Sequence, residues 1–285
     1  MHVDLSDRQA LAWLSTLIAD MRRAAPDAPL LVVGALARDL MLHHAHGIRI
    51  DRATEDADFA LATATWDAFE ALRAALVAGG AFEAVPRIAH RLRYRGGLMV
   101  DVIPFGAVET GSGNIAWPPS GEEVMNVMGY READASALQV ALPQGQMVKV
   151  VALPMFICLK LLAWRNRHRI APGKDAKDVW LALTTYIDAG NQERLYADFA
   201  HLLQADFEYE AIGAWMAGRD ANQVLRSHSS RADEIVDTLN TLIDHETAAQ
   251  GENLLPTQMS GEMNLDKAIH LLRTFRNGLN GLEHP

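Results

Sequence analysis

The chain has 285 residues, of which 49% are hydrophobic and 22% are charged, and its formal net charge is −10 at pH 7. Such a composition is that of a globular protein, with apolar surface for one large domain or two modest ones. No apolar run approaches the roughly 20 residues that span a bilayer, and the acidic N-terminal residues do not have the pattern of a signal peptide. The single cysteine, Cys158, excludes an internal disulfide framework and a cysteine-based zinc cluster. We therefore expect a cytoplasmic protein that does not associate with membranes.

The first half of the chain alternates helical and extended patterns. Apolar residues recur at helical spacing in segments 7–24, 35–44 and 66–78, with Asp7 as the expected N-cap of the first. Strand patterns cover residues 30–33, 56–61, 82–85, 88–94, 98–103, 138–141 and 147–150. Gly96-Gly97 is the expected turn of one hairpin, and segment 111–121 is expected to be a loop inside the domain.

From residue 154 onward the pattern is helical. The expected helices are 154–164, 174–188, 192–204, 209–216, 221–226 and 232–247. The sequence therefore predicts an α/β (α+β) domain over residues 1–150 and an all-helical C-terminal domain over residues 151–285.

Three aspartates have the spacing of a metal site. Asp56 and Asp58 are two residues apart in a predicted strand, so both point to one face, where their repulsion favours a cation. Asp101 lies between valines in another strand, and adjacent strands would bring the three carboxylates together for Mg²⁺-dependent phosphoryl chemistry. The structural alternative is that Asp56 caps a turn, Asp58 faces solvent and Asp101 begins an edge.

A phosphate site is expected just upstream. Gly34 ends a strand and opens a helix, where free backbone N–H groups attract anions. Gly34 and Ala35 allow close approach of the backbone, and Arg38 adds a charged donor one turn later. The alternative for Arg38 and Asp39 is a surface ion pair that contributes little stability.

These segments together resemble the nucleotidyltransferase superfamily, also called DNA polymerase β-like. Arg52, Thr54, Asp56 and Asp58 are similar to the Arg-x-Thr-x-Asp-x-Asp variant of AbiEii-type toxins, which belong to type IV toxin–antitoxin and phage-defence pairs. The resemblance implies a mixed-sheet nucleotidyltransferase core in which Asp56, Asp58 and Asp101 bind metal. One departure concerns Ala35, because the superfamily usually has Gly-Gly or Gly-Ser at this turn and a hydroxyl is therefore missing.

The resemblance extends into the helical half of the chain. Lys160, with Arg165 and Lys174 nearby, is similar to the family's third motif, in which basic residues face the nucleotide and an acid pair, here Asp175 and Asp178, closes the site. Lys160 is expected either to snorkel or to reach a phosphate, and we favour the phosphate. Asp175 and Asp178 share a helix face, and their alternative role is to stabilise the start of that helix. Segment 218–221 is also similar to related predicted nucleotidyltransferases.

The hypothesis is a transferase that uses Mg²⁺ or Mn²⁺ and a nucleoside triphosphate (NTP). Its catalytic residues are expected to be Asp56, Asp58, Asp101 and Lys160, and its nucleotide-binding residues Gly34, Ala35, Arg38, Asp39, Arg52, Thr54, Arg165, Lys174, Asp175 and Asp178. Because the chain is acidic, an RNA acceptor such as a tRNA end would need a local positive surface. Two basic runs, 87–95 and 165–169, favour such an acceptor, and Tyr94 in the first run is expected to be available for base stacking. Arg91, Arg93 and Arg95 alternate along one predicted strand and are expected to share a solvent face. An antitoxin partner is possible; the alternatives are a small-molecule nucleotidyltransferase of the aminoglycoside-modifying type and a catalytically silent nucleotide-binding module.

Overall fold

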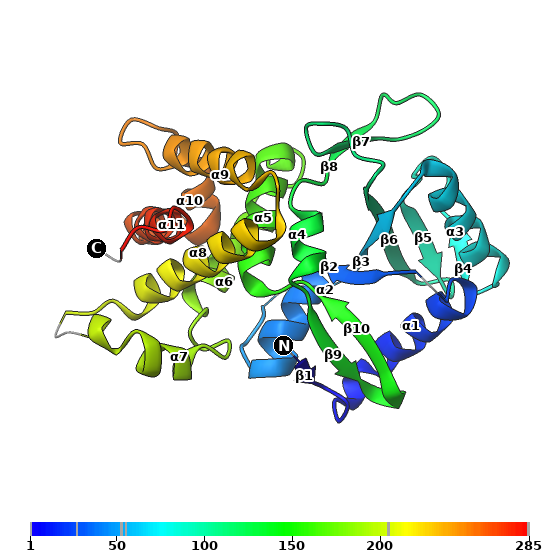
Figure 1. The fold of residues 1–285 in the computed structure, drawn as a ribbon, viewed down its shortest axis with the longest axis horizontal. Coiled ribbons are helices and arrows are strands. Elements are labelled where there is room, and N and C mark those ends of the chain that lie inside the picture. The colour runs from blue at the N-terminus through cyan, green and yellow to red at the C-terminus, as the bar shows by residue number, and fades with distance from the viewer. Residues whose placement is uncertain (1, 27, 52–53, 55, 204–205, 284–285) are drawn as a thin grey trace. The chain divides into compact units, whose positions relative to one another are not determined.

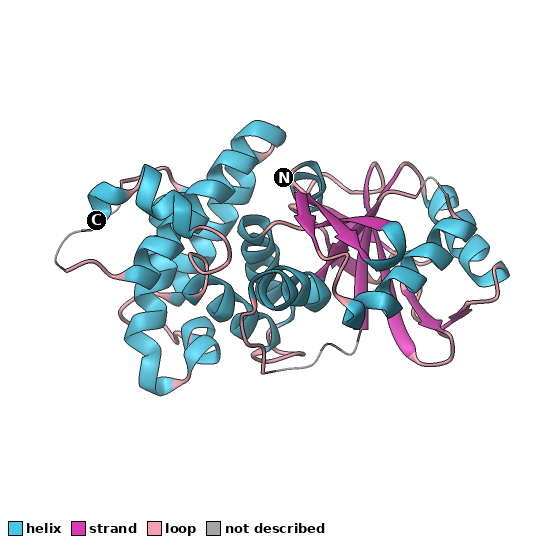
Figure 2. Cartoon of the chain, turned by 90° about the horizontal axis from the view of Figure 1, so that it is seen from below, coloured by secondary structure: helices cyan, strands magenta, loops and turns pink. Residues whose placement is uncertain are grey.

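The computed structural model describes residues 2–26, 28–51, 54, 56–203 and 206–283. The chain forms two compact units, Met1–Ala152 and Leu153–Pro285. The first unit contains a mixed sheet with helices, and the second is helical (Figures 1 and 2). The α/β class with a helical C-terminal region is confirmed.

The first unit is built on an eight-stranded sheet with the order β1-β9-β10-β2-β3-β6-β5-β4. Its strands are β1 (His2–Asp4), β2 (Leu30–Val33), β3 (Asp56–Thr63), β4 (Phe82–Ala84), β5 (Arg91–Tyr94), β6 (Leu98–Gly106), β9 (Leu138–Leu142) and β10 (Gln146–Val150). Three pairs are parallel, β1 with β9, β10 with β2 and β3 with β6, and the other neighbours are antiparallel. The central strands β2, β3 and β6 are the ones that carry the aspartate and glycine motifs.

Three helices of the first unit follow the expected order with two differences, and a fourth was not expected. The expected ones are α1 (Ala12–Ala24), α2 (Gly34–Arg38) and α3 (Trp66–Ala78), and the unexpected one is α4 (Tyr130–Ala135); short turns are η1 (Gln9–Leu11) and η3 (Pro143–Gly145). The first expected helix begins at η1 without a side-chain cap, so the prediction of Asp7 as N-cap is wrong. The second expected helix continues from α2 into a π-helical segment, η2 (Asp39–His44).

Short elements without a strong apolar pattern were not predicted. Strand β1 has only three residues, and it is held by parallel pairing with β9 rather than by a buried face of its own. The expected loop 111–121 contains β7 (Asn114–Ala116), which pairs with β8 (Val124–Asn126) in a separate two-stranded sheet. Pairing with a neighbouring strand, which sequence periodicity does not report, determines both elements.

The second unit consists of helices α5 (Leu153–Arg167), α6 (Lys174–Thr184), α7 (Gln192–Asp198), α8 (Tyr209–His228), α9 (Ala232–Glu246), α10 (Leu254–Ser260) and α11 (Leu265–Leu279), with turns η4 (Ala200–Leu202) and η5 (Glu262–Asn264). The two helices expected at 209–216 and 221–226 are one helix, α8, so a break near Gly218 was a wrong prediction. A Cβ on Gly218 would lie 2.0 Å from the carbonyl oxygen of Phe275, which shows that glycine permits α8 to pack closely on α11. Within the described part of the chain, no helix combines the length and apolar character needed to cross a membrane.

Candidate active site

A row of charged side chains crosses three neighbouring strands of the first unit. Asp58 on β3 lies opposite Asp101 on β6 in the parallel ladder, and Asp101 lies opposite Arg91 on β5 in the antiparallel ladder. Residues directly opposite one another point to the same face of a sheet, so the three side chains form one row. Asp56, two residues before Asp58, lies on the same face. We call Asp56, Asp58, Asp101 and Arg91 the acidic row.

Arg91 forms a bidentate ion pair within this row. Its Nε donates to Oδ1 of Asp101 at 2.7 Å, and its Nη2 donates to Oδ2 at 2.7 Å. Asp101 is only 6% exposed. The hydrogen bonds to Asp101 raise the pKa of Arg91 against the opposing effect of burial, and the charges of Asp101, Asp56 and Asp58 raise this pKa further. One guanidinium therefore interacts with all three carboxylates of the acidic row.

The expected stripe of three arginines on a solvent face is wrong. Arg95 has a φ of +46° and begins the hairpin turn, where its guanidinium contacts Asp20 at 2.7 Å. Arg93 lies 3.7 Å from Glu83, and Arg91 is bound to Asp101. Each arginine thus has an acidic partner, and the mutual repulsion that was expected to favour an RNA backbone is relieved within the protein.

Tyr94 is also not available for base stacking. It is buried, and its hydroxyl donates to Asp20 at 2.8 Å while it accepts from Nε of Arg95. The run 87–95 therefore contributes fewer RNA-binding groups than its composition suggested.

Gly34 packs against the carboxylate of Asp58. Because β2 pairs with β3 so that Val33 lies opposite Asp58, the next residue, Gly34, turns beside that side chain. Gly34 has a φ of +64°, and a Cβ at this position would lie 2.0 Å from Oδ2 of Asp58. Glycine is required at position 34 because its φ is positive and because a Cβ would clash with Asp58. The following residue, Ala35, is buried.

Arg38 is an internal residue, neither a surface ion pair nor an exposed phosphate ligand. It is 2% exposed, and its Nε and Nη2 donate to Oδ1 of Asp39 at 2.8 and 2.6 Å. The hydroxyl of Thr54 donates to the other oxygen of Asp39 and lies 3.4 Å from Nη2 of Arg38. These contacts hold Thr54, which lies two residues before the start of β3, against the π-helical turn. The expected nucleotide-binding residue Arg52 lies outside the described residues.

Lys160, in the second unit, is part of a buried ion network. Its Nζ lies 3.2 Å from Oδ1 of Asp175 and 2.7 Å from Oδ2 of Asp178. Lys160 is 5% exposed, Asp175 1% and Asp178 2%, so the ammonium does not snorkel to solvent. Arg167 adds a bidentate contact to Asp175, at 2.7 and 2.8 Å. We call Lys160, Arg167, Asp175 and Asp178 the buried network.

The electrostatics of the buried network favour ionised carboxylates. Burial by itself would raise the pKa of Asp175, but hydrogen bonds from Arg167 and the charge of Lys160 more than offset it, and the net effect lowers this pKa below its usual value. Of the other two basic residues predicted here, Arg165 is exposed on α5, and Lys174 is the half-buried first residue of α6. Sequence reasoning grouped Asp175 and Asp178 correctly on one helix face, but it did not identify Arg167 as their partner.

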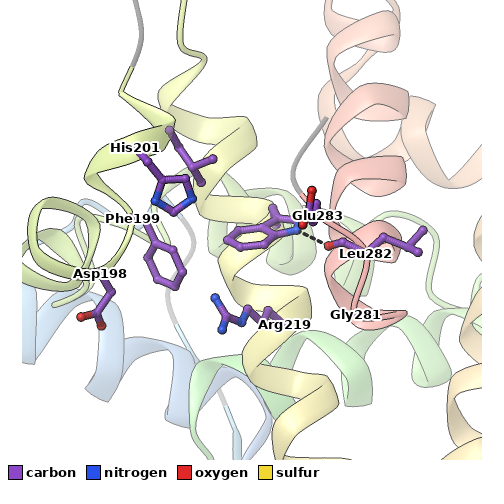
Figure 3. A pocket seen from close by; sticks show the side chains of 9 residues that line it. Asp198, Phe199, His201, Arg219, Gly281, Leu282 and Glu283 are labelled. Atoms are coloured by element: carbon purple, nitrogen blue, oxygen red, sulfur yellow. Dashed lines mark hydrogen bonds between the residues drawn. The ribbon is translucent and has the colours of Figure 1, made fainter.

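A pocket of about 680 Å³ in the second unit was not predicted (Figure 3). The guanidinium of Arg219 lies over the rings of Phe199 and Trp215, at 5.1 and 5.5 Å from their centroids, and His201 also lines the pocket. The indole N–H of Trp215 donates to the carbonyl of Leu282 at 2.8 Å, the dashed line in Figure 3. Arg219 belongs to segment 218–221, which was noted in the sequence; Trp215 lies one turn earlier on α8, whereas Phe199 comes from outside this helix.

No preformed metal cage of three or more His, Cys, Asp or Glu side chains exists among the residues that the structure describes. In the acidic row, Asp101 uses both oxygens to accept from Arg91, which leaves Asp56 and Asp58 as the carboxylates on the remaining part of the face. Mg²⁺ commonly binds through one or two carboxylates together with substrate phosphates, so this pair is a chemically suitable donor set.

The sequence matches the family described as nucleotidyl transferase AbiEii toxin, type IV toxin–antitoxin system, over residues 16–276. The chain belongs to this family. The enzyme class inferred from the aspartate motif, nucleotidyltransferase, is thus confirmed, and so is the recognition of the AbiEii-type toxins. The match spans both units of the AbiEii-family chain.

One solved structure similar to this AbiEii-family chain is the solution structure of the antibiotic-resistance factor ANT(2'')-Ia, which reveals substrate-regulated conformation dynamics of that protein. The sequences are 17% identical, the TM-score is 0.39, and the match covers 67% of this chain and 96% of that chain. A likeness of this size does not define a substrate. No curated protein is significantly similar in sequence.

Proposed function

We propose that this nucleotidyltransferase uses the acidic row to transfer a nucleotidyl group from a magnesium-bound NTP to an acceptor hydroxyl. The observation that carries the proposal is the register that sets Asp58 opposite Asp101, with Asp56 on the same face. Asp56 and Asp58 would hold Mg²⁺ or Mn²⁺, which when bound supplies electrophilic stabilisation of the phosphate oxygens. This chemistry agrees with the family to which the chain belongs.

The remaining residues act by holding these groups in place. Gly34 lets the backbone pass beside Asp58, and the contacts among Arg38, Asp39 and Thr54 fix the segment that enters β3. Preorganised groups of this kind lower the cost of reaching the transition state because they need not reorganise during the reaction. Arg52 remains our proposed source of positive charge for the triphosphate.

The direct test is incubation of the protein with each radiolabelled NTP, Mg²⁺ and total tRNA. We expect label in RNA for the wild type and loss of labelling for Asp58→Asn. Asp67→Asn, which changes an exposed aspartate in the first turn of α3, is the matched control and should retain activity. Labelling by Asp58→Asn at the wild-type rate would refute the proposed site, whereas label only in small molecules would replace RNA by the alternative acceptor class.

For the RNA acceptor, the second basic run is now the better-supported surface. Arg165 and Arg169 are exposed, and neither has an acidic partner among the residues that the structure describes. Phosphate neutralisation by such arginines makes RNA binding strongly dependent on salt. We propose that Arg165→Glu with Arg169→Glu weakens RNA association at low salt. Arg226→Glu, which reverses the charge of an arginine paired with Asp233, serves as the control.

We further propose that the protein is the toxin of a two-component pair, since its family is defined by type IV toxin–antitoxin systems. Expression of the wild type alone should then arrest growth, and expression of Asp58→Asn should not. Arrest by both proteins at equal levels would separate toxicity from nucleotidyl transfer and contradict this proposal.

A further inference from the structure

Arg219 lines the pocket of the second unit, and its guanidinium lies on two aromatic rings (Figure 3). Trp215 and Arg219 are four residues apart on α8, so they share a face of that helix. The guanidinium is 5.1 Å from the ring centroid of Phe199 and 5.5 Å from that of Trp215, and both aromatic residues are buried. Cation–π contacts of this kind orient the positive charge without neutralising it.

The backbone that carries Arg219 is held by close packing of helices. A Cβ on Gly278 of α11 would lie 2.1 Å from the carbonyl oxygen of Trp215 and 2.8 Å from the backbone nitrogen of Arg219. The carbonyl of Leu282 accepts from the indole N–H of Trp215 at 2.8 Å, so the chain after α11 is fixed as one wall of the pocket. Arg219 therefore stands on a rigid support, which lowers the cost of ordering a bound ligand.

The pocket carries charges of both signs. Asp198 and Glu283 line it together with Arg219, and both carboxylates are exposed. Among the residues that the structure describes, none of these three side chains takes part in an ion pair. The pocket thus offers the planar set of guanidinium donors at one point and carboxylate acceptors at two others.

A nucleotide of single-stranded RNA carries the groups that complement these charges. A guanidinium matches the oxygens of a phosphate with parallel hydrogen bonds, and a carboxylate accepts from the amino group of cytosine. The volume of about 680 Å³ lies within the range of about 300–1,000 Å³ that is usual for ligand pockets. One guanidinium beside two carboxylates favours the single negative charge of a phosphodiester over the several charges of a free triphosphate, because like charges repel.

We propose that this pocket binds one nucleotide of a single-stranded RNA, with its phosphodiester on Arg219 and an amino-bearing base facing Asp198 and Glu283. The inference rests on the proposed function for its ligand, since an RNA acceptor is what brings such a strand to the protein. The pocket shares no residue with the acidic row or with the exposed basic run 165–169, so it is a separate binding site that selects cytosine over uracil.

The experiment measures the binding of fluorescein-labelled hexacytidylate and hexauridylate to the full-length protein by fluorescence anisotropy, in EDTA and at about 50 mM salt, where phosphate contacts are strong. Hexacytidylate should bind at least about threefold more tightly, because uracil has no amino group. Arg219→Gln should weaken hexacytidylate binding by at least about tenfold through the loss of charge-assisted hydrogen bonds. Arg226→Gln removes the same charge from the same helix at an arginine paired with Asp233, and it should bind within about twofold of the wild type.

A second readout locates the bound strand in the pocket. In protein labelled with 5-fluorotryptophan, the ¹⁹F resonance of Trp215, assigned with Trp215→Phe, should shift on titration with hexacytidylate and should not shift in Arg219→Gln. Arg219→Lys keeps a positive charge but loses the planar donor set, so we expect it to bind hexacytidylate more weakly than the wild type. Asp198→Ala combined with Glu283→Ala should abolish the preference for hexacytidylate over hexauridylate.

Equal affinity of Arg219→Gln and the wild type for hexacytidylate, equal affinity of the wild type for the two hexamers, or an unshifted Trp215 resonance at saturation would overturn the inference. If Arg219→Gln does not fold, Arg219→Lys and the wild-type resonance decide. Label transfer to tRNA without these binding effects would leave the proposed function standing and remove only this site. Arg219-dependent binding of hexacytidylate without any label transfer would keep the site and remove the proposed function.

Discussion

The acidic row and the buried network both consist of aspartates and basic residues, but they differ in composition and in exposure to solvent. In the acidic row, three carboxylates face one arginine, and Asp56 and Asp58 are half-exposed. In the buried network, two carboxylates face one lysine and one arginine, and the lysine and both aspartates are 5% exposed or less. Asp56 and Asp58 of the first cluster are within reach of solvent, whereas both carboxylates of the second are enclosed by the protein. Exposure to solvent, more than the identity of the residues, distinguishes the two clusters.

The largest difference between the two clusters should be seen in activity. Asp58→Asn removes a charge from the acidic row, where the carboxylate is proposed to hold the metal. We expect nucleotidyl transfer to fall by about 10³-fold or more, which is about 4 kcal/mol of transition-state stabilisation. The free energy of unfolding without metal should change by less than about 1 kcal/mol, because the substitution also relieves repulsion among the carboxylates.

The measurement for Asp58→Asn combines label transfer with thermal unfolding in the presence and absence of Mn²⁺. The wild type should be stabilised by Mn²⁺, since a ligand that binds only the folded state raises the unfolding temperature. The variant should lose most of this stabilisation. Equal Mn²⁺ stabilisation of both proteins would show that Asp58 does not bind the metal.

In the buried network, the main effect should be on stability. Lys160→Met keeps the apolar stem but removes the ammonium between Asp175 and Asp178, leaving buried carboxylate charge without this partner. Breaking a buried ion pair on one side costs about 3–5 kcal/mol. Chemical denaturation should show this loss, whereas Lys177→Met, at an exposed position on α6, should be near neutral. An unchanged midpoint for Lys160→Met, together with lost activity, would return Lys160 to its expected role at a phosphate.

Adding Asp178→Asn to Lys160→Met sharpens this prediction. The double variant removes an acid together with its base, so it should recover part of the stability lost in the single variant. If the loss of stability in the double variant equals the sum of the losses in the two single variants, the residues do not interact.

Gly34 offers a smaller perturbation of the acidic row. Gly34→Ala introduces a Cβ 2.0 Å from Oδ2 of Asp58 and also a side chain at a φ of +64°. We expect a loss of about 1–3 kcal/mol in the free energy of unfolding and a displaced carboxylate with weaker Mn²⁺ binding. Gly96→Ala, at a φ of +72° with nothing within 4 Å of the added Cβ, reports the backbone strain alone. If both variants bind Mn²⁺ as the wild type does, the contact with Gly34 has no role in placing Asp58.

The sequence predicted the strands of the acidic row but not its arginine, and the reason is register. A two-residue turn at Gly96-Gly97 would have set Arg91 opposite Val102. The actual loop also includes Arg95, with Tyr94 opposite Leu98, and this shift by one residue brings Arg91 opposite Asp101. A shift of one residue exchanges the faces of a strand, and the side-chain pattern of so short a strand does not specify it.

Close packing was similarly hidden in the sequence. Gly34 was expected to let a phosphate approach the backbone. The group that a side chain at this position would meet is instead the carboxylate of Asp58 on a neighbouring strand. Residues 217–220 were left between two expected helices, whereas Gly218 lies inside one helix and allows it to pack closely on another. A glycine indicates that something approaches the backbone, but only the tertiary structure identifies what approaches. Periodicity did identify α3 with both ends correct, because its apolar face and terminal residues are local features.

The smallest effect concerns the pH dependence of the buried network. The pKa of Asp175 is lowered in the folded protein, so the stability it contributes is fully present above the pKa of an unfolded aspartate, about pH 4, and is lost as the pH falls through the lowered pKa. Arg167→Gln removes the hydrogen bonds that lower this pKa, and burial, which raises it, should then have more influence. We expect the variant to be less stable at neutral pH and to lose stability at a higher pH than the wild type during acidification. Arg165→Gln, two residues earlier on α5 and exposed, should follow the wild type in urea unfolding between neutral pH and about pH 4. Identical pH profiles for the two variants would show that Arg167 does not keep Asp175 ionised, and the balance of the buried network would then rest on Lys160 alone.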